Sequence, residues 1–141
     1  MNKFTLLAWV LRLNAIVLMM ALIPVLFPYS LMNSIHQWLG LGELPNTSIT
    51  EYLTRSLSLV YALHGTVCLT LAMDVRKYLP LIQLIAIYHF VFGLIMLAID
   101  LKSGLPWYWI IGEGPMIAAF AVFVFFFCKI CRQELDQEKD E

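Results

Sequence analysis

Four stretches of the chain are long and apolar enough to cross a lipid bilayer, and no other feature restricts its fold as strongly. A spanning helix needs about 20 mostly apolar residues, and the stretches lie at about 4–28, 51–73, 79–99 and 106–130. Hydrophobic residues make up 61% of the 141 residues and charged residues 13%, against about 45–50% and about 25% in soluble domains. A soluble fold of this size could not bury so much apolar surface. We therefore predict an all-α polytopic membrane protein, with a bundle of four transmembrane helices in a single domain over residues 1–130.

The joins between the four stretches carry signals of their own. Pro28 is expected to end the first helix, because proline cannot easily continue one. Ser48 and Glu51 form an S-x-x-E capping box, which predicts the start of the second helix. Gly104 and Pro106 supply turn residues between the third and fourth stretches.

The long connection at residues 29–50 and the C-terminal end have different patterns. Apolar residues recur at helical spacing in the first part of the connection, which predicts a short helix lying in the membrane interface between spans one and two; they are Leu31, Ile35, Trp38 and Leu39. Residues 131–141 are polar and alternate in charge, so we expect a frayed or disordered polar tail on the cytoplasmic side.

The distribution of lysine and arginine predicts the orientation. Cytoplasmic ends of membrane spans carry an excess of these residues. Two of the nine lie on one predicted side, Arg55 and Lys102, and the other seven lie on the opposite side. These seven are Lys3, Arg12, Arg76, Lys77, Lys129, Arg132 and Lys139. Both termini are therefore expected in the cytoplasm, with Trp38 and the aromatic residues 107–109 at the outer interface.

The second stretch is expected to pack at the centre of the bundle. On a helical wheel its small and polar residues share one half, which in a membrane marks helix–helix contact; they include Ser58, Tyr61, Ala62 and Gly65. The other half should face lipid, and it carries Leu59, Val60, Leu63, Val67 and Leu71.

Three ionisable residues form the candidate ligand-binding site. Arg55 lies on the predicted inward face of the second helix, and Asp100 and Glu113 fall at similar depth on the third and fourth. Charges within a span are costly, so each requires a partner. Gly112, Glu113, Gly114 and Pro115 predict a kink beside the Glu113 carboxylate. The cluster can be either a structural ion pair or a polar binding site open to the outer face.

His64 and His89 are the candidate haem ligands. They fall at matching depth in the second and third helices, as a bis-histidine haem b in a four-helix bundle would require. Mutual or backbone hydrogen bonds are the competing explanation. We expect no metal site, and the pair Cys128 and Cys131 lacks the strand–turn–helix context of a redox motif.

The chain also resembles known proteins. The sequences EYLTRS at 51–56, YALHG at 61–65, DVR at 74–76 and GLPWYWIIGEGP at 104–115 are similar to those of uncharacterised small bacterial membrane proteins, over roughly residues 36–127. More loosely, the four-span layout resembles the DoxX-like group. The resemblance implies a compact four-helix bundle in the bacterial inner (cytoplasmic) membrane and transfers no catalytic residue.

Three kinds of function follow from these patterns. The leading hypothesis is a non-enzymatic membrane bundle that associates with itself or with other membrane subunits. The second is a protein that binds or transports a small ligand at Arg55, Asp100 and Glu113, and the third is a haem- or quinone-linked redox subunit. The net charge of −1 gives no indication of nucleic-acid binding, and the expected partners are the lipid bilayer and other membrane subunits.

Overall fold

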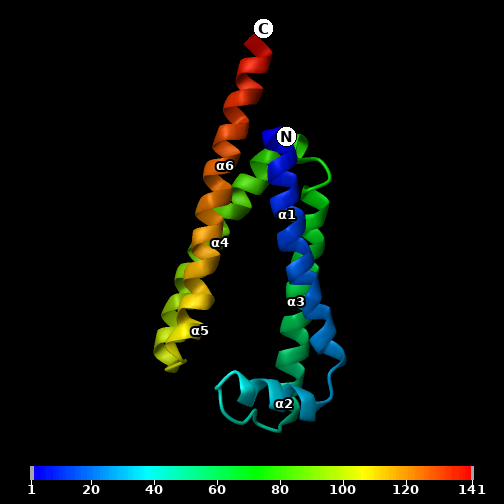
Figure 1. Cartoon of the computed structure of the whole chain (residues 1–141), viewed down its shortest axis with the longest axis vertical. Helices are drawn as coiled ribbons and strands as arrows, with labels where there is room; N and C mark the ends of the chain where they lie inside the picture. The colour runs from blue at the N-terminus through cyan, green and yellow to red at the C-terminus, as the bar shows by residue number, and fades with distance from the viewer. Residues whose placement is uncertain (1, 141) are drawn as a thin grey trace. The chain divides into compact units, whose positions relative to one another are not determined.

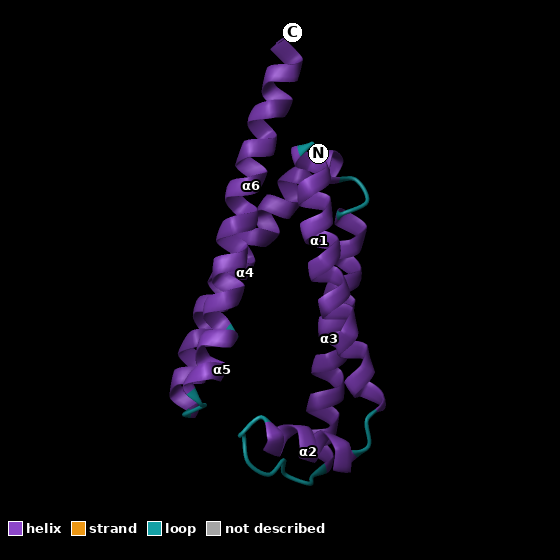
Figure 2. Cartoon of the chain, viewed as in Figure 1, coloured by secondary structure: helices purple, strands orange, loops and turns teal. Residues whose placement is uncertain are grey.

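In a computed structural model of the chain, which describes residues 2–140 apart from the side chains of residues 139 and 140, every regular element is a helix. In chain order the elements are α1 (Lys3–Met19), the 3₁₀ helix η1 (Met20–Leu26), α2 (Tyr29–Trp38), α3 (Ser48–Leu71), α4 (Val75–Ser103), α5 (Trp107–Gly112) and α6 (Gly114–Asp140). Short loops join them (Figures 1 and 2). The predicted all-α class is confirmed for the described residues.

Three segments are long and apolar enough to cross a membrane, where four spans were predicted. They are Lys3–Leu26, Val75–Ser103 and Trp107–Glu138. The helix α3 is 24 residues long but less apolar, because it contains Glu51, Arg55, His64 and several serines and threonines. The number of spans therefore stays a prediction at four.

The first span does not continue as an α-helix to Pro28. The α-helix ends at Met19, and the tighter η1 continues to Leu26 with Pro24 inside it. Proline lacks the N–H group that an α-helix would use at this position, and its ring crowds the carbonyl one turn earlier. A 3₁₀ segment suits this end of the helix. Pro28 instead precedes α2 as its N-terminal cap.

Two helices, α3 and α4, begin with a side-chain cap. The Thr47 hydroxyl accepts a hydrogen bond from the Thr50 backbone N–H at 3.2 Å, so Thr47 caps α3, and the prediction of Ser48 was wrong by one residue. Asp74 caps α4 in the same way, accepting from the Lys77 N–H at 3.1 Å. Both caps satisfy a backbone donor that has no partner within its helix.

Polar side chains of α2 hold the loop that follows it, between α2 and α3, through hydrogen bonds to the loop backbone. Asn33 accepts a hydrogen bond from the Leu44 N–H at 2.9 Å, and the His36 ring lies 2.8 Å from the Gly42 carbonyl oxygen. Gly40 and Gly42 have positive φ angles of 71° and 85°, which let the chain turn back. The predicted helix at this position is confirmed; its placement in a membrane interface stays a prediction.

The helix predicted to kink near residue 113 is interrupted at that residue. Glu113 separates α5 from α6 with φ −106° and ψ −89°, and Pro115 occupies the second position of α6, where a missing N–H costs no helical hydrogen bond. At the other end, α6 continues to Asp140. The expectation of a frayed tail from residue 131 is therefore wrong for the described part; Glu141 and the Lys139 side chain, which entered the charge count, lie outside it.

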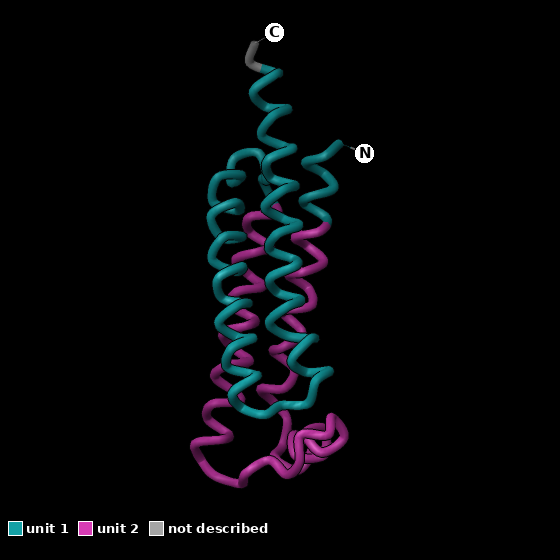
Figure 3. Tube along the Cα trace, turned by 90° about the vertical axis from the view of Figure 1, so that its left-hand side faces the viewer, with its two compact units in different colours: residues 1–9, 73–141 teal, residues 10–72 magenta. Residues whose placement is uncertain are grey.

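The chain divides into two compact units (Figure 3): unit 1 comprises residues 1–9 and 73–141, and unit 2 comprises residues 10–72. The prediction of one domain stays a prediction.

In unit 1, α4 packs along α6 through a seam of mostly small buried residues. A Cβ atom added at Gly93 would lie 2.7 Å from the Gly114 carbonyl oxygen and 2.8 Å from the Ala118 nitrogen. Further along, α6 buries Ala121, Cys128 and Cys131. Such close backbone approach is typical of helix pairs in membranes.

In unit 2, the predicted contact face of α3 is largely confirmed. A Cβ atom added at Gly65 would lie 2.8 Å from the Ala15 carbonyl oxygen of α1, and Ala62 is buried as well. Three residues depart from the prediction. Leu71, assigned to the lipid face, is buried, and Tyr61 and Thr66, assigned to the contact face, are exposed.

Candidate functional site

Asp100 is the most deeply buried charged residue among those that the structure describes. It lies near the C-terminal end of α4, with 2% of its surface exposed. Its Oδ2 atom has no hydrogen-bond partner in the described part of the chain. Asp100 follows Gly93 by seven residues, or about two turns, so both lie on the α4 face that packs on α6. An unpaired buried carboxylate oxygen is costly, which marks this position as a candidate ligand contact.

Glu113 lies at the break between α5 and α6 in the same unit. The Trp109 indole nitrogen donates a hydrogen bond to Glu113 Oε2 at 2.7 Å. A Cβ atom added to the next residue, Gly114, would lie 2.6 Å from the Leu97 nitrogen of α4. Leu97 is three residues before Asp100, a rise of about 4.5 Å. Asp100 and Glu113 therefore occupy neighbouring levels of two facing helices.

Arg55, the third candidate, belongs to unit 2 and has partners there. Its Nη2 atom lies 3.5 Å from a Glu51 carboxylate oxygen and donates to the Phe27 carbonyl at 3.3 Å, while its Nε atom is buried without a hydrogen-bond partner in the described region. Glu51 and Arg55 are four residues apart in the same helix. Side chains at this spacing are neighbours on the helix surface, so the pair can be read from the sequence. The predicted pairing of Arg55 with Glu113 joins two units and stays a prediction.

The two candidate haem ligands each contact their own helix. His89 Nδ1 lies 2.8 Å from the Ile85 carbonyl oxygen, and His64 Nε2 lies 3.5 Å from the Cys68 thiol. His64 belongs to unit 2 and His89 to unit 1. Among the described residues, no group of three or more histidine, cysteine or acidic residues could hold a metal ion.

Two polar features were not predicted from the sequence. In unit 2, the Asn14 amide donates to the Cys68 sulfur at 3.8 Å, so Asn14, Cys68 and His64 form a short polar chain between α1 and α3. Cys68 was missed because its neighbours in the sequence are apolar.

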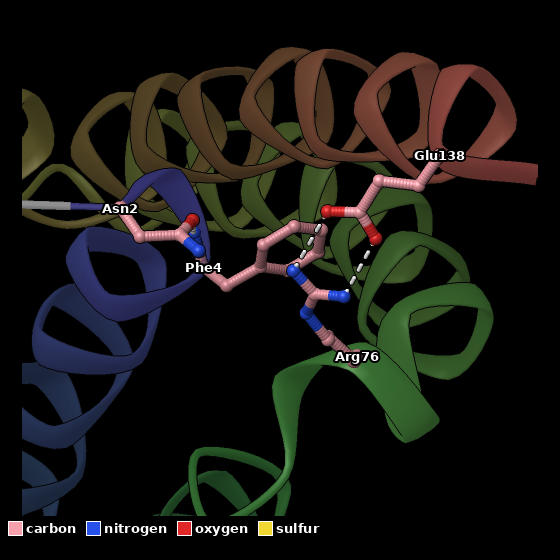
Figure 4. Close-up of polar contacts among 4 residues, drawn as sticks. All are labelled: Asn2, Phe4, Arg76 and Glu138. Carbon is pink, nitrogen blue, oxygen red and sulfur yellow. Dashed lines mark hydrogen bonds and ion pairs between the residues drawn. The ribbon is translucent and has the colours of Figure 1, made fainter. Parts of the chain in front are cut away.

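The second feature is an ionic cluster in unit 1, at the end formed by the start of α4 and the end of α6. Arg76 donates two hydrogen bonds to the Glu138 carboxylate, at 2.8 and 3.1 Å, and its guanidinium carbon lies 4.4 Å from the centre of the Phe4 ring (Figure 4). Lys3 pairs with Glu134 at 3.1 Å. These lysines and arginines entered the sequence argument only as indicators of orientation.

No family model, curated protein or solved structure matches the chain. Its function must therefore be argued from its own residues.

Proposed function

We propose that the chain is an integral membrane protein with four spans, both termini in the cytoplasm, and a non-enzymatic role as a bundle that associates with itself or with other membrane subunits. The observation that carries this proposal is the apolar outer surface of both units. On α6, Phe123, Phe126 and Ile130 are exposed, and on α4 so are Leu94 and Ile95. Side chains of this kind need lipid or another apolar surface.

Including α3 as a span rests on how its polar residues are distributed. Gly65 of α3 packs against α1, whereas Val60 and Leu63 are 60% and 65% exposed. A helix with one apolar outer face can contact lipid while its polar groups face other helices. The charge asymmetry favours the orientation, and the bacterial inner membrane as location rests on the resemblance to small bacterial membrane proteins.

Membrane extraction followed by mass measurement tests this proposal. The full chain should stay in the membrane pellet after alkaline carbonate washing, as integral proteins do. Native mass spectrometry in a mild detergent should then show dimers or larger assemblies, or a co-purifying membrane subunit. Release into the carbonate supernatant would contradict membrane integration, and a strictly monomeric chain without a partner would contradict the assembly role.

A second candidate function is favoured by the unpaired Oδ2 atom of Asp100. A small ligand that donates a hydrogen bond or carries positive charge would satisfy this oxygen, with Glu113 nearby and Arg55 as a predicted third group. Native mass spectra of the wild-type chain should then contain a small adduct that Asp100→Leu loses while its helix content is retained. Spectra without an adduct in the wild-type chain would count against this function. A visible absorption spectrum without a Soret band would exclude haem b on His64 and His89.

A further inference from the structure

A small cavity lies beside the ionic cluster of unit 1. Its volume is about 210 Å³, below the roughly 300–1,000 Å³ of pockets that enclose drug-sized molecules. It therefore suits one charged group of a ligand rather than a whole molecule. Three of the seven lining residues are cationic and one is acidic; the lining consists of Arg76, Lys77, Leu79, Pro80, Arg132, Leu135 and Asp136.

Two of the three cations of this cavity, Arg76 and Arg132, are held in position by neighbouring groups. Arg76 is held by its two hydrogen bonds to Glu138 and by its contact with the Phe4 ring (Figure 4). Asn2 in turn accepts a hydrogen bond from the Phe4 N–H at 3.0 Å, which orders the start of α1. Arg132 donates to the Gln83 side chain at 3.4 Å. Less side-chain freedom is then lost when an anion binds.

The surroundings of the cavity favour an anion. Arg76 and Lys77 lie in the first turn of α4, where the helix dipole adds positive potential. Asp136 is the only acidic group in the lining, and Arg76 is paired with Glu138, so the positive charges of Lys77 and Arg132 face one negative charge. Arginine and lysine are the usual protein partners of phosphate oxygens.

The apolar part of the lining distinguishes this cavity from a site open only to water. The apolar residues of the lining are Leu79, Pro80 and Leu135. From this level the apolar parts of α4 and α6 begin, and both helices are long and apolar enough to cross a membrane. A cationic pocket at such a boundary is where the headgroup of an anionic lipid would lie, with its acyl chains along the apolar helix faces.

We infer that this cavity binds the phosphate group of an anionic phospholipid through Lys77 and Arg132, beside the Arg76–Glu138 pair. The inference rests on the proposed membrane location, since only an inserted chain meets the lipid at this level.

The test compares the full chain with two variants in a mild detergent. Native mass spectrometry would measure retention of added phosphatidylglycerol against phosphatidylcholine for the wild type, for Lys77→Gln with Arg132→Gln, and for Lys102→Gln. Lys102 is a matched control because it lies at the opposite end of α4. Arg76 is left unchanged, since both of its terminal nitrogens already donate to Glu138.

A cation near an anionic headgroup contributes roughly a fivefold change in affinity. The double variant should therefore bind phosphatidylglycerol about 20- to 30-fold more weakly, whereas Lys102→Gln should bind it like the wild type. Circular dichroism must show equal helix content in all three proteins. Equal preference for phosphatidylglycerol in the wild type and the folded double variant would overturn the inference.

A further arm separates the lipid from a free anion. Inorganic phosphate at millimolar concentration should raise the melting temperature of the wild type much less than phosphatidylglycerol does, because it lacks the acyl chains. Equal stabilisation by inorganic phosphate would overturn the lipid assignment. Carbonate extraction of the same variants separates this test from membrane integration: a chain that stays in the membrane but shows no lipid preference refutes the inference alone.

Discussion

Replacing Gly93 by alanine should weaken the packing of α4 against α6. The added Cβ atom would lie 2.7 Å from the Gly114 carbonyl oxygen and 2.8 Å from the Ala118 nitrogen, whereas non-bonded carbon contacts are most favourable at about 3.5–4.0 Å. Both clashing atoms belong to the backbone, so no side chain can rotate away. The two helices would have to separate by roughly an ångström.

The expected size of the effect follows from two opposing terms. Over-packing a well-packed interface costs typically about 1–3 kcal/mol, and alanine recovers about 1 kcal/mol of helix propensity relative to glycine. Because the obstruction is backbone on the facing helix, we take the upper half of the range and expect a net loss of about 1–2 kcal/mol. Gly114→Ala obstructs the same contact from α6, so the double variant should lose less than the sum of the two single losses.

The assay is reversible unfolding in a mild detergent, followed by circular dichroism at the helix band. Gly112→Ala is the matched control, since a Cβ atom there meets nothing within 4 Å, and it should show no loss of stability. If Gly93→Ala is as stable as Gly112→Ala, the helices do not approach as closely as described, and the packing argument fails.

Two further predictions concern α3. Gly65→Leu should destabilise unit 2 by about 1–3 kcal/mol or more, because the new side chain would enter the contact with α1. Leu63→Ala, on the exposed face, should leave the stability nearly unchanged. Equal thermal stability of the two variants would show that α3 does not pack through this face. Arg55→Ala and Glu113→Ala should each lower the stability of the chain. If the two residues pair, Arg55→Leu with Glu113→Leu should recover part of that loss. Additive losses in a double-mutant cycle would show that the two side chains do not meet.

The sequence was sufficient for the features that depend on local chemistry. The helical class follows from the long apolar stretches, and the interruption at Glu113 follows from the adjacent glycines and Pro115. The contact face of α3 was predicted because small residues at helical spacing have a direct packing consequence, confirmed at Gly65 and Ala62.

Features that depend on neighbouring elements were predicted less well. Leu71 is apolar and was assigned to lipid, yet it is buried, because a helical wheel shows which residues share a face but not whether another part of the fold covers that face. The polar C-terminal end was not expected to be helical. Its acidic residues form ion pairs with Lys3 and Arg76, which belong to other helices, and the local sequence does not reveal these partners. For the candidate site, the sequence identified Asp100 as a buried group but did not anticipate that Trp109 would bind Glu113.

The ion pair between Arg55 and Glu51 was not predicted from the sequence. Arg55 was assigned a partner on a distant helix because a charge in a span requires one, although Glu51 lies one turn away in the same helix. A partner four residues away on the same helix needs no tertiary contact, so this spacing by itself indicates the Arg55–Glu51 pair.

The central claim, that α3 crosses the membrane and makes four spans, is tested most directly by reporters of membrane sidedness. Fusions after Pro45, after Arg76 and at the C-terminus would each report whether the junction lies inside or outside the cytoplasm. Four spans predict an external reading after Pro45 and cytoplasmic readings at the other two positions. The same reading after Pro45 and Arg76 would show that α3 does not cross, which would leave three spans and contradict the account.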